Sequence, residues 1–264
     1  MRWSVGALCV AGVLVALSFP PRTGEAATGV TGSTGLLLVP TADVTPNEQF
    51  AFGGVITDYQ AFPAKKFSYF RDNKPSFYFG GYLTIGYIPR VEITIRGNGM
   101  PSATGPGRTG PFYTDGMISM QVLAHKGSGW MPSVGFGMQD MYGFMLFNAL
   151  YGVVTWTFPG RDAGPLVISL GWATDWYNKN QGTADEDWDV NHVMNGFMAG
   201  VEYPVRRWVA TLTEYDSRSL NVGVRLRPVW WCTFDVAALR WGLDELARQR
   251  VGGFGAHLHF DGRI

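Results

Sequence analysis

The chain has 264 residues, of which 21 are basic and 21 acidic, so its formal net charge is zero. This balance argues against a nucleic-acid-binding protein, which normally carries a basic excess. Charged residues make up only 16% of the chain and hydrophobic residues 46%, which excludes a disordered chain. The 35 glycines and the aromatic share of 14% favour many short β-strands joined by turns, in one large β domain.

Residues 1–26 have the features of a secretory signal peptide. Met1 and Arg2 form a short positive region, and an apolar run follows over residues 5–19. This run is too short to cross a bilayer as a helix, which needs about 20 apolar residues. We therefore expect cleavage after Ala26 and export across the inner membrane, with a retained membrane anchor as the alternative.

Cysteine usage provides no disulfide framework. Cys9 lies in the apolar run of the signal peptide, so Cys232 is left without an intramolecular partner in the mature chain. No apolar run of about 18 or more residues follows the signal peptide, and the sequence therefore predicts no transmembrane helix.

Apolar and polar residues alternate in segments that recur to the end of the chain. In residues 90–98, Val91, Ile93 and Ile95 alternate with polar neighbours, and residues 219–227 show the same period. Because successive side chains of a strand point to opposite faces, each segment has one apolar and one polar face. The predicted strands are residues 49–57, 76–87, 90–98, 115–124, 133–141, 146–157, 165–174, 195–203, 207–216, 219–227, 230–239 and 251–260.

The predicted connections differ in length. Those over residues 58–75, 99–114 and 175–194 are long, whereas most connections after even-numbered strands are short. Outer-membrane β-barrels show this asymmetry, with short turns in the periplasm and long loops outside the cell. Residues 242–250 are the one segment with a helical pattern, and they predict a helix of about two turns.

Three further features indicate a barrel that crosses a membrane. The predicted strands are close in length to the roughly 9–11 residues with which a tilted strand crosses a bilayer. Tyr and Trp residues gather near the predicted strand ends, as they do in interfacial girdles. The last strand carries the pattern G-x-x-L-x-F in Gly255, Leu258 and Phe260, which resembles the terminal recognition signal of bacterial outer-membrane barrels.

These features predict an all-β protein, a single antiparallel transmembrane β-barrel preceded by the cleaved signal peptide. We expect about 12 strands, within a range of roughly 10–14, over residues 49–264. Residues 27–48 are then an N-terminal periplasmic or lumen-plugging segment. A secreted soluble β-protein that binds a ligand remains the alternative.

In a membrane barrel, the polar faces of these strands line the lumen. A basic residue on the lipid face would cost about 2–4 kcal/mol at mid-bilayer, and a lumen position avoids this cost. Such residues either pair and fill a narrow barrel or line a path through a wider one. The lumen-facing candidates are Glu92, Arg96, Gln139, Glu202, Glu214, Arg225, Arg227 and His257.

Three stretches of the chain resemble the YjbH-like family of outer-membrane β-barrels. Residues 32–50 carry G-x-x-G-L-L-x-x-P-x-A followed by P-x-x-x-F, residues 86–92 read GYIPRVE, and residues 214–225 carry E-Y-D…N-x-G-x-R. The resemblance implies an outer-membrane protein of a Gram-negative cell with a supporting or conduit role in exopolysaccharide production or export. It implies outer-membrane lipid, the exopolysaccharide and other secretion components as partners, and it transfers no catalytic residues.

Motifs for catalysis or cofactor binding are weak. Residues 105–110 satisfy G-x-G-x-x-G but lie between two predicted strands, whereas a dinucleotide site needs a strand before and a helix after. Carboxylates in residues 185–189 could bind Ca²⁺, but Val190 replaces the glycine that a calcium loop requires. His257 and His259 share a strand face without a third ligand nearby. We expect no catalytic residue, metal or cofactor, with an outer-membrane lipid- or glycan-modifying enzyme as the alternative function.

Overall fold

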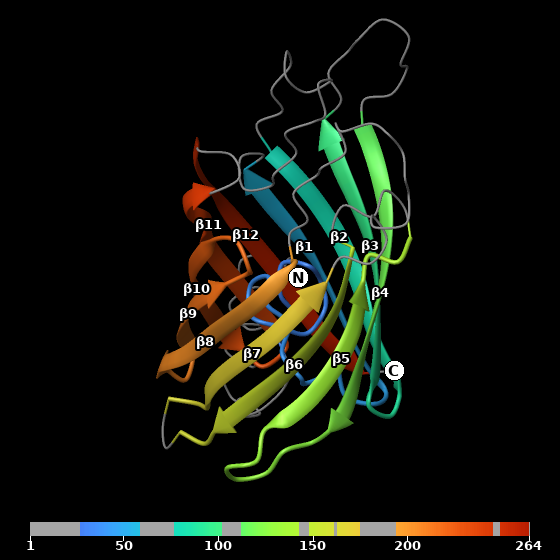
Figure 1. Ribbon diagram of the computed structural model, residues 1–264. Helices are drawn as coiled ribbons and strands as arrows, with labels where there is room; N and C mark the ends of the chain where they lie inside the picture. The colour runs from blue at the N-terminus through green and yellow to red at the C-terminus, as the bar shows by residue number, and fades with distance from the viewer. Residues whose placement is uncertain are drawn as a thin grey trace, which may run out of the picture.

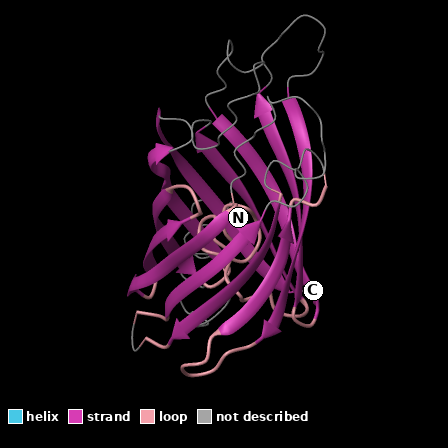
Figure 2. Ribbon diagram, viewed as in Figure 1, coloured by secondary structure: helices cyan, strands magenta, loops and turns pink. Residues whose placement is uncertain are grey.

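The computed structural model describes residues 27–58, 77–101, 112–142, 148–160, 163–174, 194–244 and 249–263. Within these ranges, twelve antiparallel strands form one closed barrel, because each strand pairs with its neighbours in the chain and β12 pairs with β1 (Figure 1, Figure 2). The predicted antiparallel barrel of about twelve strands is confirmed. The strands are β1 (Gln49–Asp58), β2 (Phe77–Ile88), β3 (Val91–Pro101), β4 (Phe112–His125), β5 (Ser133–Gln139), β6 (Ala149–Phe158), β7 (Leu166–Thr174), β8 (Gly196–Arg206), β9 (Val209–Tyr215), β10 (Leu220–Val229), β11 (Cys232–Asp244) and β12 (Gln249–Arg263).

The prediction of a helix over residues 242–250 is wrong for the part of this segment that the structure describes. β11 continues to Asp244 and β12 begins at Gln249, and these two residues pair with each other. A helix of about two turns is marginal by itself, because few hydrogen bonds offset the cost of nucleation. Strand pairing instead extends the hydrogen-bonded ladder that already joins β11 and β12. In the described part of the chain, no helix is long and apolar enough to cross a membrane.

The two ends of the barrel carry connections of different length. The short-turn end holds the connections after even-numbered strands, at residues 89–90, 126–132, 159–165, 207–208 and 230–231. The long-loop end holds the connections at residues 59–76, 102–111, 140–148, 175–195, 216–219 and 245–248. Gln49 pairs with Arg263, so the chain enters and leaves the barrel at the short-turn end, where Figure 1 marks the C-terminus.

Side chains alternate between the two faces of the barrel wall. In β3, Glu92, Thr94 and Arg96 are buried, whereas Ile93 and Ile95 are 39% and 52% exposed. The same period of two runs through the other strands, since successive side chains point to opposite faces. Large apolar side chains on the exposed, outward face include Phe52, Ile56, Leu83, Ile118, Phe136, Trp172, Phe197, Val222, Val224, Val236, Phe254 and Leu258. The outer surface of the barrel is therefore apolar.

The buried core lies inside the barrel and combines the N-terminal segment with the wall. Leu36, Leu37 and Val39 belong to one buried apolar cluster with Met198 of β8 and Leu212 of β9. Figure 1 shows the N-terminal segment, in blue, inside the ring of strands. The strands alone do not form this core, because its centre is supplied by residues that precede β1.

Candidate functional site

Residues 27–48, called the plug from here on, occupy the lumen before the chain enters β1. The plug folds back on itself, because the N–H of Val30 donates to the carbonyl of Leu37 at 2.7 Å and Gly35 forms a β-bridge with Pro40. Gly32 has a φ of 89°, a backbone conformation that glycine adopts without steric cost. The plug is therefore a compact loop with its own backbone hydrogen bonds.

Glu214 on β9 binds the backbone of the plug at its centre. Its Oε1 accepts the N–H of Leu38 at 2.7 Å, and its Oε2 accepts the N–H groups of Leu37 at 3.0 Å and Val39 at 3.1 Å. Asn221 on β10 donates from Nδ2 to the same carboxylate at 2.9 Å. Successive backbone N–H groups that converge on an anion form a nest. Each of these buried donors would cost about 1–3 kcal/mol if it were left without an acceptor.

Glu92 on β3 joins two distant points of the plug. Its Oε1 accepts the N–H of Thr34 at 2.8 Å, and its carboxylate also accepts the Thr34 hydroxyl. Its Oε2 accepts both the N–H and the hydroxyl of Thr45, each at 2.8 Å. One buried carboxylate thus fixes the turn in the plug and the segment that leads out of it toward β1.

Arg225 on β10 is a buried cation that joins wall carboxylates to plug carbonyls. Its Nε and Nη2 donate to Asp235 at 2.8 and 3.0 Å, its Nη1 donates to Glu202 at 2.8 Å, and its Nη2 also donates to the carbonyl of Leu36 at 2.8 Å. Glu202 forms a second ion pair of 2.7 Å with Arg227, whose side chain is 30% exposed. Pairing of this kind is needed because an unpartnered buried charge is strongly destabilising.

Neutral polar side chains hold the rest of the plug. Gln121 on β4 donates from Nε2 to the carbonyls of Thr41 and Asp43, both at 2.6 Å. Thr155 on β6 accepts the N–H of Ala42 at 2.8 Å. Strands from both halves of the barrel therefore bind the plug, which lies across the lumen rather than against one wall.

Two glycines on the inner wall lie where the plug comes close to the strands. A Cβ at Gly86 on β2 would overlap the carbonyl oxygens of Thr45 and Pro46, and a Cβ at Gly200 on β8 would overlap the side chain of Leu36. At Gly86 a Cβ would have to displace the plug backbone where it leads into β1, whereas at Gly200 the overlapping atom is the end of the flexible Leu36 side chain, which can move.

A chain of hydrogen bonds beside the plug has the order acid, histidine, hydroxyl. Asp235 lies 3.1 Å from Nδ1 of His257, and Nε2 of His257 lies 2.6 Å from the hydroxyl of Tyr82. Such an order can activate a nucleophile. Here the hydroxyl of Thr28, in the plug, lies 2.7 Å from that of Tyr82, and Tyr82 and His257 are only 6% and 1% exposed. The chain therefore ends on the plug through Tyr82, and its three side chains are buried away from any external substrate.

The residues predicted from the sequence to face the lumen fall into separate groups. Arg227 is half-buried at the edge of the barrel interior, and the others are buried: Glu92, Arg96, Gln139, Glu202, Glu214, Arg225 and His257. One network joins four of them: Arg225 pairs with Glu202 and Asp235, Glu202 also pairs with Arg227, and Asp235 also lies against His257.

The remaining predicted residues act apart from that network. Glu92 and Glu214 bind the plug separately, and Arg96 donates to the carbonyl of Val30 at 3.0 Å. Gln139 ends β5, and its Nε2 has no hydrogen-bond partner among the described residues.

Sequence reasoning missed Asp235, which joins Arg225 to His257 in the charged network. It shares the buried face of β11 with Thr233 and Ala237, so the period of two could have identified it. Of the other histidines, His125 is exposed at the end of β4. The described residues contain no group of three or more His, Cys, Asp or Glu side chains that could hold a metal. Residues 105–110, 185–189 and His192 lie outside the described part of the chain.

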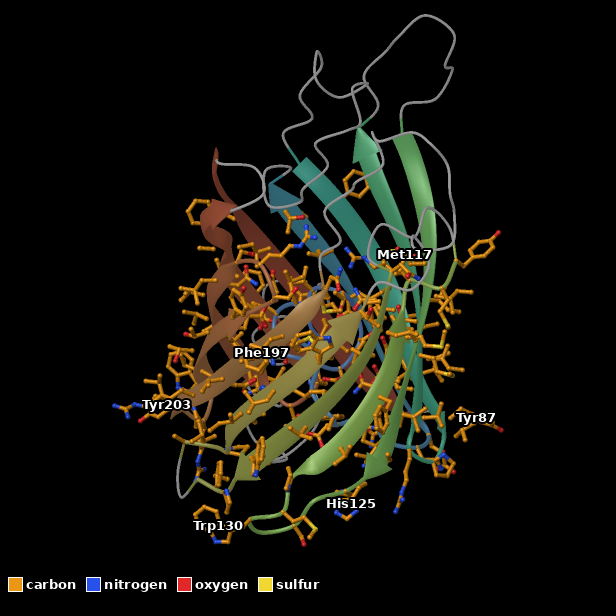
Figure 3. The ribbon with its side chains drawn as sticks, viewed as in Figure 1. Tyr87, Met117, His125, Trp130, Phe197 and Tyr203 are labelled. Atoms are coloured by element: carbon orange, nitrogen blue, oxygen red, sulfur yellow. The ribbon has the colours of Figure 1, made fainter. Side chains whose placement is uncertain are left out.

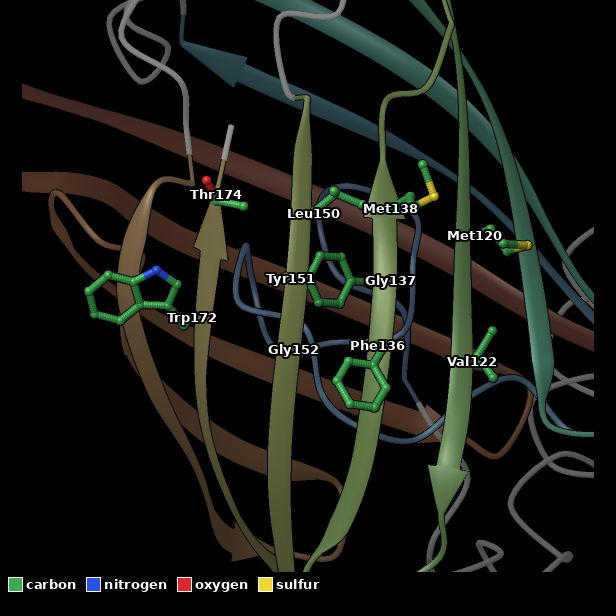
Figure 4. Close-up of a pocket in the computed structure, with 10 residues that line it drawn as sticks. All are labelled: Met120, Val122, Phe136, Gly137, Met138, Leu150, Tyr151, Gly152, Trp172 and Thr174. Carbon is green, nitrogen blue, oxygen red and sulfur yellow. The ribbon is translucent and has the colours of Figure 1, made fainter. Parts of the chain in front are cut away.

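A shallow groove of about 480 Å³ crosses the outer face of β4–β7. Figure 4 shows Phe136 and Trp172 on either side of Gly152, with Met120 and Leu150 farther along the groove. No charged side chain of the described residues lines it. The groove therefore continues the apolar outer surface.

Within the described residues, the fold and its interior define a closed twelve-stranded β-barrel whose lumen is occupied by its own N-terminal segment. A model of the YjbH family, described as exopolysaccharide biosynthesis protein YbjH, matches residues 28–219 of this chain. The chain belongs to this family, as the three resembling stretches predict. The matched region includes nearly all of the plug and continues through β9, so it contains Glu92, Glu202 and Glu214. No curated protein matches the chain.

Proposed function

We propose that this protein is an outer-membrane β-barrel of a Gram-negative cell that supports exopolysaccharide production or export with its lumen closed by the plug. Cleavage of the signal peptide after Ala26 would deliver it to that membrane. The observation that carries the proposal is the division of side chains in a closed barrel, with apolar residues exposed outside and charged residues buried around the plug. The family description supplies the link to exopolysaccharide.

The outer surface supports a membrane location. A protein in water rarely exposes an apolar surface that is continuous over many strands, because the cost of hydrating it is large. β1, β6 and β10 have 10 residues each, close to the 9–11 that a tilted strand needs to cross the hydrocarbon core. A closed barrel also leaves no unpaired strand edge, whose backbone N–H and C=O groups would find no hydrogen-bond partner in lipid.

The plug favours a supporting role over an open conduit. A polysaccharide chain that crossed the lumen would have to displace the plug. Displacement would remove the plug N–H and hydroxyl donors from Glu92 and Glu214 and the Leu36 carbonyl from Arg225. A buried hydrogen-bonding group left without its partner costs about 1–3 kcal/mol, and a charged group costs more. The closed state therefore suits a barrel that anchors or positions other secretion components.

A disulfide between plug and wall tests this role. A Cβ built on Gly135 of β5 would lie 3.4 Å from the Cβ of Ala42 and 3.0 Å from its Cα, so a small shift outward brings the two Cβ atoms to the separation of about 3.8 Å in disulfides. We expect the double variant Gly135→Cys with Ala42→Cys, in a Cys232→Ser background, to oxidise in the periplasm. Exopolysaccharide output should then equal that of the wild type and of Ala42→Cys alone. Output that falls on oxidation and recovers with a reductant would mean that the plug must move, as in a conduit.

The buried Tyr82–His257–Asp235 chain is the one observation that favours a lipid- or glycan-modifying enzyme. If its role is structural, Tyr82→Phe removes one hydroxyl and leaves exopolysaccharide output unchanged in cells with normal barrel levels. Loss of output from a correctly assembled Tyr82→Phe barrel would support the enzymatic function.

Heat-modifiable mobility of the extracted protein tests the barrel itself, and a protein found only in soluble fractions would contradict the membrane location.

A further inference from the structure

Basic and aromatic side chains surround the barrel at its short-turn end. We call this set the basic–aromatic rim. Its aromatic members are 57–85% exposed, and its basic members are exposed as well: Tyr87, Arg90, Lys126, Trp130, Tyr203, Arg206, Arg207 and Trp208.

The rim follows the perimeter of the barrel. Tyr87 lies near the end of β2, Arg90 lies in the β2–β3 turn, and Lys126 and Trp130 lie in the connection between β4 and β5. Figure 3 shows Tyr87 and Tyr203 pointing outward from opposite sides of the barrel at a similar height, with Trp130 near its lower end. The rim therefore includes residues on opposite sides of the barrel and is not a patch on one side.

Exposed charges at this end are mostly positive. Among the described residues there, one exposed side chain is acidic, Glu48. The exposed basic side chains are Arg90, Lys126, Arg206, Arg207 and Arg263. Glu202, which could have neutralised the rim, instead points into the barrel and pairs with Arg225 and Arg227. The described part of this end therefore attracts anions.

One part of the rim forms a hollow of about 260 Å³. It is lined by Ala163, Val205, Arg206, Arg207 and Trp208, so it combines guanidinium groups with an apolar floor and an indole ring. A guanidinium group binds phosphate through two parallel hydrogen bonds. Tryptophan and tyrosine prefer the boundary between lipid tails and water. The hollow thus fits a phosphate attached to an apolar body.

We propose that the basic–aromatic rim binds the headgroups of anionic phospholipids, with the Arg206–Arg207–Trp208 hollow as one headgroup site. The proposal rests on the membrane location proposed above and adds a lipid class to it. Lipid is favoured over a soluble anionic polymer because Ile88, Met131 and Val205, which are 41–61% exposed, accompany the basic residues. A polymer in water would leave these apolar side chains exposed, whereas lipid covers them and the phosphates reach the basic groups.

Lipid binding to the purified, folded full-length protein tests the proposal. Native mass spectrometry would measure the binding of phosphatidylglycerol and of zwitterionic phosphatidylcholine with the same acyl chains. A basic residue near an anionic lipid surface contributes about 1 kcal/mol, which is roughly a fivefold change in affinity. The double variant Arg206→Gln with Arg207→Gln should therefore lose on the order of 25-fold in its preference for phosphatidylglycerol.

Two further variants separate charge from folding. Arg218→Gln removes a cation at the long-loop end and should keep the full preference, because Arg218 lies far from the rim in the β9–β10 connection. Arg206→Lys with Arg207→Lys keeps both charges and should retain most of it. The wild-type preference should also weaken as salt is added, because exposed charges are screened.

The other outcomes separate this proposal from the proposed function. Equal binding of both lipids by the wild type, or the same preference in the Gln variant, would overturn the lipid proposal while leaving the barrel in its membrane. Displacement of phosphatidylglycerol by low concentrations of a soluble anionic polysaccharide would also overturn it and assign the rim to a polymer. Failure of the wild type to insert into phosphatidylcholine vesicles would instead contradict the membrane location.

Discussion

The carboxylate of Glu214 on β9 accepts a hydrogen bond of 2.7 Å from the backbone N–H of Leu38, 176 residues earlier in the chain. The N–H groups of Leu37 and Val39 donate to the other oxygen of the same carboxylate. At Glu214 the wall thus holds the plug through backbone atoms, whose positions depend on the path of the chain and not on particular plug side chains.

Replacement of Glu214 by Gln should loosen the plug. The amide keeps one acceptor oxygen, but its NH₂ group must face a backbone donor, either that of Leu38 or those of Leu37 and Val39. We expect a loss of about 1–3 kcal/mol in the free energy of unfolding, measured by urea titration of the detergent-folded protein. Protease cleavage within residues 27–48 should also become faster.

Thr213→Val is the matched control for this substitution. Thr213 neighbours Glu214 but is exposed on the outward face, so unfolding and proteolysis should match the wild type. If Glu214→Gln behaved like this control, the carboxylate would not be what holds the plug.

Gly86→Ala should also destabilise the folded state. Its methyl group would overlap the carbonyl oxygens of Thr45 and Pro46 where the plug leads into β1. Overpacking of this kind costs about 1–3 kcal/mol. Gly97→Ala is the control, because a Cβ at Gly97 meets no atom within 4 Å. Urea titration should show a loss for the first variant alone, and equal stabilities would place the plug elsewhere.

Charges on the outward face should impair assembly in the membrane. Ile93→Arg and Val224→Arg each replace an apolar side chain that is about 40% exposed and should cost about 2–4 kcal/mol near mid-bilayer. Quantitative blots of heat-modifiable protein in outer-membrane fractions would measure the loss. Ile93→Leu should assemble normally. Full assembly of both Arg variants would argue that this face meets water.

The long-loop end should face the outside of the cell. An epitope tag inserted between residues 182 and 183 should react with antibody on intact cells, because the β7–β8 connection lies at that end. A tag between residues 128 and 129, in the β4–β5 connection, should react only after the outer membrane is permeabilised. The reverse pattern would invert the proposed orientation.

Several features of this barrel follow from the sequence alone because they depend on neighbouring residues. The alternation of Glu92 with Ile93 assigns each side chain to a face of the wall, since a period of two is a local property of a strand. The same reasoning works less well for residues 242–250, where a local helical pattern competes with strand pairing. There the partner strand decided the structure, as Asp244 pairs with Gln249.

Other features were decided only by the tertiary structure. The sequence determined the strands, their faces and the family, but it left the plug as one of two possible roles for residues 27–48. Closure of the barrel by β1 and β12 placed that segment in the lumen, beside Glu92, Glu214 and Arg225. Contacts between residues 176 positions apart, like that of Glu214 with Leu38, leave no periodic trace in the sequence. The burial of backbone N–H and C=O groups requires them to find partners, and only the folded barrel determines which side chains those partners are.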